Sequence, residues 1–211
     1  MPKTEDPTDA RSLIPARPSL AGLREAAAGC RGCGLYRNAT QTVFGEGLTR
    51  AEVMLVGEQP GDQEDRRGTP FVGPAGRELD RALEEAGIDR ETVYVTNVVK
   101  HFKFTPRGKR RIHKTPNAEE IAACRPWLEA EVAVVKPALI VALGATAAQA
   151  LLGRGFRITR QRGDFFPSDL GPEITATVHP SAVIRAPDEE RREQHRLFVR
   201  DLTRVARRLD G

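Results

Sequence analysis

The chain has 211 residues, of which 39% are hydrophobic and 29% charged, and its formal net charge is +4. This length can bury a hydrophobic core, and we expect a single domain over residues 19–211 behind a flexible, proline-rich lead-in over residues 1–18. No apolar run approaches the roughly 20 residues of a membrane span, and the N-terminus lacks the apolar core of a signal peptide. The sequence therefore favours a cytoplasmic protein, and the lack of an obvious apolar interface stripe favours a monomer.

The predicted elements alternate between strands and helices. Helical spacing or capping residues predict helices at residues 19–29, 74–86, 117–135, 145–152 and 187–209, and Pro126 is expected to kink or split the third of these. Apolar runs predict strands at residues 53–57, 93–99, 138–144 and 174–178, and residues 156–166 fit a hairpin or an irregular edge. Because strands joined by helices form parallel βαβ units, the sequence predicts an α/β fold: a three-layer α/β/α sandwich with a central, mostly parallel sheet.

Polar side chains stand where three of these strands end. Glu58 follows the first strand, Asn97 lies near the end of the second, and His179 follows the last. Ligands of open parallel sheets bind outside the carboxyl ends of the strands, so these groups predict a site for hydrogen bonding and proton transfer. Each also has a structural alternative: a plain strand-to-helix turn, a cap and a satisfied imidazole. Phe71, in a loop rich in Pro and Gly, either plugs the core or stacks on a flat ring.

A basic loop is predicted between the second strand and Pro116, and the stretch from Val98 to Ala118 contains no acidic residue. Its basic residues are Lys100, Lys103, Arg107, Lys109, Arg110, Arg111 and Lys114. So many like charges face either water or an anion, and phosphate is the common anion. A nucleic-acid contact and a merely solvated loop both remain open.

The cysteines predict a metal or cluster site. Their number, three, argues against a disulfide framework. Cys30 and Cys33 form a Cys-x-x-Cys pair, and Cys124 stands alone far along the chain. In a reducing compartment this spacing favours metal or cluster binding over disulfide chemistry.

Five ordered segments resemble the iron–sulfur uracil-DNA glycosylases of family 4: Gly57-Glu58-Gln59-Pro60-Gly61, Thr69-Pro70-Phe71-Val72-Gly73, Thr96-Asn97-Val98-Val99-Lys100, Cys124-Arg125-Pro126-Trp127-Leu128 and His179-Pro180-Ser181. The run Lys109-Arg110-Arg111-Ile112-His113 looks like the loop inserted in the UdgX branch of that family. The resemblance covers about residues 20–205. It implies a uracil-DNA glycosylase-like fold, a [4Fe-4S] cluster and uracil-containing DNA, at least single-stranded, as the partner.

The resemblance also implies a role for each matching residue. Phe71 would stack on a uracil flipped out of the DNA, Asn97 would read its Watson–Crick edge, and His179 would stabilise the uracil anion as it leaves. Glu58 and Gln59 would lie beside the sugar, with Gln59 also near the uracil.

His113 would be the nucleophile. Ordinary relatives add water to the cation-like C1′, whereas the UdgX branch adds this histidine and stays bonded to the abasic sugar. A positioned imidazole can outrun water that is not held in line, and Glu58 could take the remaining ring proton. One alternative is an ordinary multiple-turnover glycosylase whose basic loop only binds DNA. Another is a non-catalytic metal-bearing nucleic-acid sensor, which the presence of Glu58, Asn97 and His179 together disfavours.

The cluster ligands follow from the same resemblance. Family-4 relatives use four cysteines, and aligning the segment around Asn97 puts His101 at the position of the third. Cys30, Cys33, His101 and Cys124 would then hold the cluster. Histidine can ligate iron–sulfur centres, and a structural zinc ion competes because its ligand set can be the same.

Four basic residues are expected to contact DNA. Lys109, Arg110 and Arg111 would bind phosphates, so that binding weakens steeply with salt. Arg185, with Ile184, would follow the minor groove and fill the space left by the flipped base. The alternative is a plain turn before the last helix.

Overall fold

A six-stranded sheet forms the centre of the structure, a computed structural model that describes residues 9–209. In spatial order its strands are β1 (Glu46–Gly47), β3 (Tyr94–Asn97), β2 (Val53–Gly57), β6 (Leu139–Leu143), β8 (Glu173–Thr177) and β7 (Phe165–Phe166). The four inner strands are parallel, and the short edge strands β1 and β7 are antiparallel to their neighbours. The prediction of a mostly parallel sheet is confirmed.

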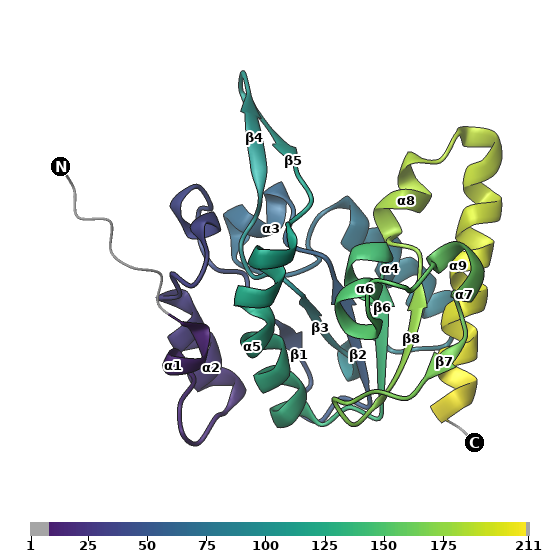
Figure 1. Ribbon diagram of the computed structural model, residues 1–211. Helices are drawn as coiled ribbons and strands as arrows, with labels where there is room; N and C mark the ends of the chain where they lie inside the picture. The colour runs from purple at the N-terminus through teal and green to yellow at the C-terminus, as the bar shows by residue number, and fades with distance from the viewer. Residues whose placement is uncertain (1–8, 210–211) are drawn as a thin grey trace.

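Helices cover both faces of the sheet (Figure 1). The helices on one face are α1 (Ala10–Leu13), α2 (Leu20–Ala28), α5 (Ala118–Val135) and α6 (Ala145–Leu152), and those on the other are α4 (Pro74–Glu85), α8 (Pro180–Arg185) and α9 (Asp188–Leu209). Alternate residues of β2 point to opposite faces: Met54 packs into the first core and Leu55 into the second. The predicted three-layer α/β/α sandwich is therefore confirmed.

An antiparallel hairpin, β4 (Phe104–Arg107) and β5 (Arg110–His113), projects beyond the carboxyl ends of the parallel strands (Figure 1). Phe104 pairs with His113, and Gly108 at the tip has φ +58°, a conformation that glycine adopts without strain. The prediction of an irregular loop was wrong here. The segment lacks a buried face of alternating apolar residues, and the contacts that hold it come from distant parts of the chain.

Short elements complete the fold. They are α3 (Asp62–Arg67) and α7 (Ile158–Gln161), with single 3₁₀ turns at Gly34–Arg37 and Arg90–Thr92. Helices α3 and α8 follow directly after polar strand ends, and neither was predicted. Residues 156–166 form α7 and the edge strand β7, in keeping with the predicted irregular edge rather than a hairpin.

Helix α5 begins where the sequence predicts. The Asn117 side chain accepts a hydrogen bond from the backbone N–H of Glu120 (2.8 Å), and the Glu120 carboxylate accepts one from Asn117 N–H (2.7 Å), which forms a capping box. The helix runs unbroken through Pro126, so the expected split did not occur. Proline removes only one intrahelical hydrogen bond, and the buried Trp127 and Leu128 keep this stretch packed in the core.

The N-terminal prediction needs a correction where the structure describes that segment. Residues 1–8 lie outside the described part of the chain. Ala10–Leu13 form α1, and Ala10 is buried in the core beside α5. A lead-in separate from the domain is therefore wrong for these residues. Across residues 9–209, no helix is both long and apolar enough to span a membrane.

Candidate active site

A pocket of about 630 Å³ opens at the carboxyl edge of the parallel strands. Each inner strand contributes to its wall: Glu58 follows β2, Asn97 ends β3, Leu143 ends β6 and His179 follows β8. The structure thus brings the three polar strand ends together, at the edge where such sheets bind ligands.

Phe71 and Asn97 meet at the inner wall of this pocket. A Cβ atom at Gly57 would overlap Asn97 Oδ1 and lie 2.9 Å from Phe71 Cζ, so only glycine lets the two side chains approach each other across β2. The Phe71 ring is stacked towards His179, with ring centroids 6.2 Å apart and planes inclined by 27°. The Phe71 backbone has φ +56°, which is rare for an aromatic residue. The local backbone therefore presents a flat ring to the pocket.

The Asn97 carboxamide is ready to bind a ligand. Asn97 is 2% exposed and lines the pocket, yet no residue within 9–209 hydrogen-bonds to its side chain. A carboxamide carries two donors and an acceptor on one planar group. A buried polar group without a protein partner is costly unless a ligand or water pairs with it, so Asn97 offers a donor–acceptor pair to a flat polar ring.

His179 is a neutral imidazole, and its hydrogen bonds show which ring nitrogen carries the hydrogen. Burial lowers its pKa to about 4, and the nearby Arg185 adds to the shift, although Glu58 opposes it. Nδ1 accepts a hydrogen bond from the backbone N–H of Ser181 (3.1 Å) and lies 2.8 Å from Ser181 Oγ. Because Nδ1 is an acceptor in the neutral ring, Nε2 carries the hydrogen and can donate to a ligand.

Glu58 and His113 form the reactive pair of the pocket. His113 Nε2 lies 3.2 Å from Glu58 Oε1, and that oxygen is buried without any aligned donor among the described residues. Burial raises the pKa of Glu58, but the nearby His113, Thr146 and His179 side chains outweigh it and leave the pKa below its usual value. Glu58 is therefore a carboxylate placed to accept a proton from His113.

Gln59 holds the hairpin over the pocket. Its Nε2 donates to the carbonyl oxygens of Lys103 (3.3 Å) and Lys114 (3.0 Å), and its Oε1 accepts from Lys103 N–H (3.0 Å). These two residues flank the hairpin at its base. The Gln59 amide is thus engaged with the backbone that carries His113, while the residue also lines the pocket.

Arg111 anchors the middle of the hairpin. Its guanidinium bonds to Asp62 and, at 2.6 Å, to Asp65, which is fully buried. The same group lies over the rings of Phe102 (5.4 Å) and Phe104 (5.0 Å). The structure therefore gives Arg111 partners inside the protein, whereas the basic run predicts a phosphate contact.

The other basic residues expected to contact DNA remain accessible to a ligand. Lys109 and Arg110 are exposed at the hairpin tip. Arg185, at the end of α8, lines the mouth of the pocket together with Ile184. Exposed cations therefore lie on two separate elements, the hairpin tip and the end of α8, and of these Arg185 lines the pocket.

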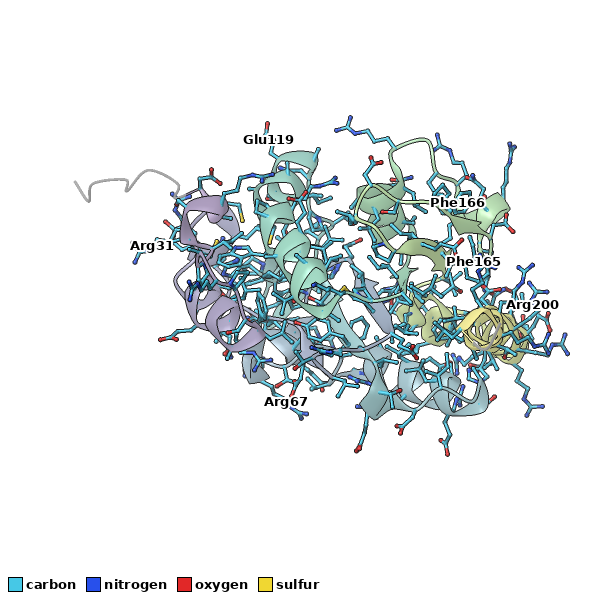
Figure 2. The ribbon with its side chains drawn as sticks, turned by 90° about the horizontal axis from the view of Figure 1, so that it is seen from below. Arg31, Arg67, Glu119, Phe165, Phe166 and Arg200 are labelled. Carbon is cyan, nitrogen blue, oxygen red and sulfur yellow. The ribbon has the colours of Figure 1, made fainter. Side chains whose placement is uncertain are left out.

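Cys30 and Cys33 follow α2 directly in the chain, and Cys124 lies on α5 close to both of them. Cys30 Sγ accepts a hydrogen bond from Trp127 Nε1 and Cys124 Sγ from Lys100 N–H, both at 3.2 Å. Burial raises the pKa of Cys124 to about 12, and both other cysteines are close enough to add to that shift. Arg31, between the first two cysteines, lies on the opposite side of the molecule from Phe165 and Phe166 (Figure 2).

His101 lies in the same region as the cysteines. It is buried, and its Nε2 lies 2.9 Å from Thr42 Oγ1, which leaves Nδ1 without a hydrogen bond in the described chain. No three His, Cys, Asp or Glu residues within 9–209 are placed to hold a single metal ion. The structure brings the donor atoms to one region without converging them on one point.

Sequence reasoning missed two carboxylates that shape the site. Glu64 accepts from Gly73 N–H (2.7 Å) and Gly61 N–H (3.1 Å), which joins the loop after Phe71 to the turn after Glu58. Asp65 forms an ion pair with Arg111 and also accepts a hydrogen bond from the backbone N–H of Thr40. The available signal was the acidic run Asp62–Asp65 after a glycine, which suits the first turn of a helix.

These features define an α/β protein whose pocket presents a planar ring, a free carboxamide and a histidine–carboxylate pair. The family model described as the uracil DNA glycosylase superfamily matches residues 44–203, and the chain belongs to this superfamily.

Similar proteins include three named type-4 uracil-DNA glycosylases. The protein from Thermotoga maritima is 40% identical over 177 residues, which cover 83% of this chain and 87% of that protein. The one from Pyrobaculum aerophilum is 39% identical, covering 80% and 86% of the two chains. The one from Sulfurisphaera tokodaii is 35% identical, covering 81% and 78%.

Proposed function

We propose that this protein excises uracil from DNA and then becomes covalently bonded, through His113, to C1′ of the abasic site, as the UdgX branch does. Similarity to the type-4 enzymes supports the excision step. The observation that carries the covalent step is the 3.2 Å separation of His113 Nε2 from the buried Glu58 carboxylate at the pocket.

Excision begins when the flipped uracil enters the pocket. Its ring stacks on Phe71, and its O4 and N3–H pair with the Asn97 carboxamide. The C1′–N1 bond breaks, and its electron pair leaves with uracil as an anion delocalised onto O2. His179 Nε2–H donates to O2. Because its pKa is about 4, His179 remains a neutral donor and stabilises this charge without giving up its proton.

Capture follows at the sugar. The leaving uracil has left a cation-like C1′, and a ring nitrogen of His113 forms a bond to it with its lone pair. The resulting imidazolium transfers its remaining N–H proton to Glu58. Gln59 and Arg111 keep the hairpin over the pocket, so the imidazole attacks before an unheld water molecule does.

DNA binding rests on cations around the opening. Lys109, Arg110 and Arg185 would contact phosphates or the minor groove of uracil-containing DNA, which includes single-stranded DNA. Each phosphate contact releases a counterion, so the affinity falls with salt. The protein would act as a monomer in the cytoplasm.

A [4Fe-4S] cluster held by Cys30, Cys33, His101 and Cys124 is part of this proposal. The donor set fits: three buried or half-buried sulfurs lie together, two of them accepting N–H hydrogen bonds, and His101 keeps one ring nitrogen free. A structural zinc ion is the competing occupant, because its ligand set can be the same. When bound, the cluster would pin the cysteine loop to α5.

The test uses labelled single-stranded DNA with one uracil, mixed with the full chain and run on a denaturing gel. A shifted, heat-stable band is expected from the wild type and not from His113→Ser, which should instead give alkali-labile product. His195→Ser is the matched control and should keep the band, because His195 lies on α9 outside the pocket. A band that survives His113→Ser contradicts the covalent role, and alkali-labile product without a band from the wild type indicates ordinary turnover.

A further inference from the structure

Lys100 and Glu131 form a buried ion pair behind the pocket. Lys100 is 1% exposed and Glu131 0%, and neither lines the pocket or takes part in the chemistry proposed above. Burying two charges usually costs about as much as their attraction returns. The pair is therefore better explained by what it holds in place than by a gain in stability.

The Lys100 ammonium uses all three of its donors. They go to the Glu131 carboxylate, to Thr96 Oγ1 at 2.6 Å and to the backbone carbonyl oxygen of Asn97 at 2.8 Å. An ammonium has three N–H donors and no acceptor, so its position is fully determined. Edge strand β1 pairs with β3 only as far as Val95. The hydrogen bond to the Asn97 carbonyl oxygen therefore comes from the Lys100 ammonium and not from β1.

Glu131 fixes the other end of this connection. Besides Lys100, its carboxylate accepts from the Tyr94 hydroxyl (2.9 Å), the Thr96 hydroxyl (2.9 Å) and the backbone N–H of Gly45 (3.1 Å). Tyr94 and Thr96 lie on β3, and Glu131 lies on α5. The ion pair therefore clamps the carboxyl end of β3 to a helix of the core.

The Asn97 side chain has no such support of its own. Its carboxamide oxygen lies against Gly57, where a Cβ atom would overlap it, but the carboxamide has no hydrogen-bond partner among residues 9–209. The direction of the carboxamide therefore depends on the Asn97 backbone, and Lys100 holds that backbone at its carbonyl oxygen.

We propose that Lys100 is a positioning residue for base recognition: with Glu131 it fixes the end of β3 so that the Asn97 carboxamide points at the edge of the uracil. This inference rests on the proposed function, in which Asn97 reads that edge. A carboxamide that points away from the uracil edge loses hydrogen bonds to uracil. The protein then also loses its discrimination against bases with a different donor pattern.

The test is the double variant Lys100→Met/Glu131→Gln, which removes both charges and keeps their approximate volumes and the Glu131 acceptor. Uracil release from single-stranded DNA should slow about tenfold under single turnover, the size of one lost hydrogen bond. Affinity for the same DNA carrying a tetrahydrofuran abasic analogue should not change, because that DNA has no base to read. The control pair Arg208→Met/Glu173→Gln, exposed and remote from the pocket, should change neither.

A second background separates positioning from a general structural effect. In an Asn97→Ala protein the double substitution should not slow uracil release any further, because its effect passes through Asn97. The inference is overturned if the double substitution slows uracil release equally in the wild-type and Asn97→Ala proteins, or if the folded variant shows no slowing. A wild type that releases no uracil contradicts the proposed function as well. Normal release by the wild type, with rate losses from the double substitution and from Asn97→Ala that simply add in free energy, contradicts this inference alone.

Folding of the variants is checked by circular dichroism. If the double variant does not fold, Thr96→Val carries the test, since it removes a hydroxyl that bonds to both Lys100 and Glu131 but leaves the two charges paired. It should again slow uracil release only where Asn97 is present, and a cost equal in both backgrounds overturns the inference in the same way.

Discussion

Glu58 and His113 divide the chemistry of the pocket because their surroundings differ. The Glu58 side chain is 18% exposed and sits at the end of a buried strand, whereas that of His113 is 51% exposed on the hairpin. The carboxylate is thus fixed by the core, and the imidazole reaches it from outside. A substrate sugar that enters between the hairpin and the core would meet both groups.

His179 should make stability depend on pH. Its pKa is about 4 in the folded protein and near its usual value when unfolded, so between those values the unfolded chain binds the extra proton. Stability attributable to this residue is present above the unfolded pKa and should fall by about 2 kcal/mol between about pH 7.5 and pH 5. Urea unfolding of the wild type and His179→Asn at both pH values measures the difference, and identical pH dependence in the two proteins would contradict the prediction.

At the scale of the element, the hairpin β4–β5 is held by side chains rather than by a buried face. Gln59 binds the backbone at its base, and Arg111 ties its middle to Asp62 and Asp65. Gln59 lies in the turn after β2, next to Glu58, and Asp62 and Asp65 lie on α3. The position of His113 relative to Glu58 therefore depends on these contacts.

Arg111→Gln should uncouple capture from excision. With the anchor lost, His113 is held less well, and a misplacement of about 1 Å can cost up to about a hundredfold in rate. We expect the ratio of crosslinked DNA to released uracil to fall at least tenfold while uracil release persists. Arg110→Gln is the control on the same strand: it should weaken DNA binding but keep the ratio. A ratio unchanged by Arg111→Gln would show that the anchor does not position His113.

At the scale of the whole molecule, the cysteine region lies beneath the β3 end of the site. Lys100 donates its backbone N–H to Cys124, and its ammonium bonds to Asn97. The proposed cluster and the pocket therefore share one short segment of chain. A substitution in the cysteine region should therefore disturb the position of Asn97 in the pocket through this segment.

Cys124→Ala should lower stability and activity together. Losing the proposed cluster should reduce the melting temperature by about 10 °C, as expected for a loss of roughly 3 kcal/mol in a domain of this size. Brown absorbance, iron content and uracil release should all decrease. Full uracil release from a colourless, equally stable variant would contradict a structural cluster.

Much of the fold could be predicted because its signals are local. The apolar run Val53–Gly57 matches β2, and the box formed by Asn117 and Glu120 starts α5. Helices α3 and α8 were missed because their sequences are short and polar and follow directly after strand ends. The hairpin was missed because the contacts that make it a hairpin come from Gln59 and Arg111, whose partners are distant in sequence.

The α/β class and the residues at the strand ends follow from the sequence alone, because apolar periodicity and capping act within a few residues. The sequence also placed His113 in a basic segment that resembles a known insertion. That His113 lies beside Glu58, that Arg111 faces Asp62 and Asp65, and that Lys100 bonds to Asn97 became known from the folded chain. These pairings join groups far apart in the chain, so their energies depend on burial and distance that no local pattern encodes.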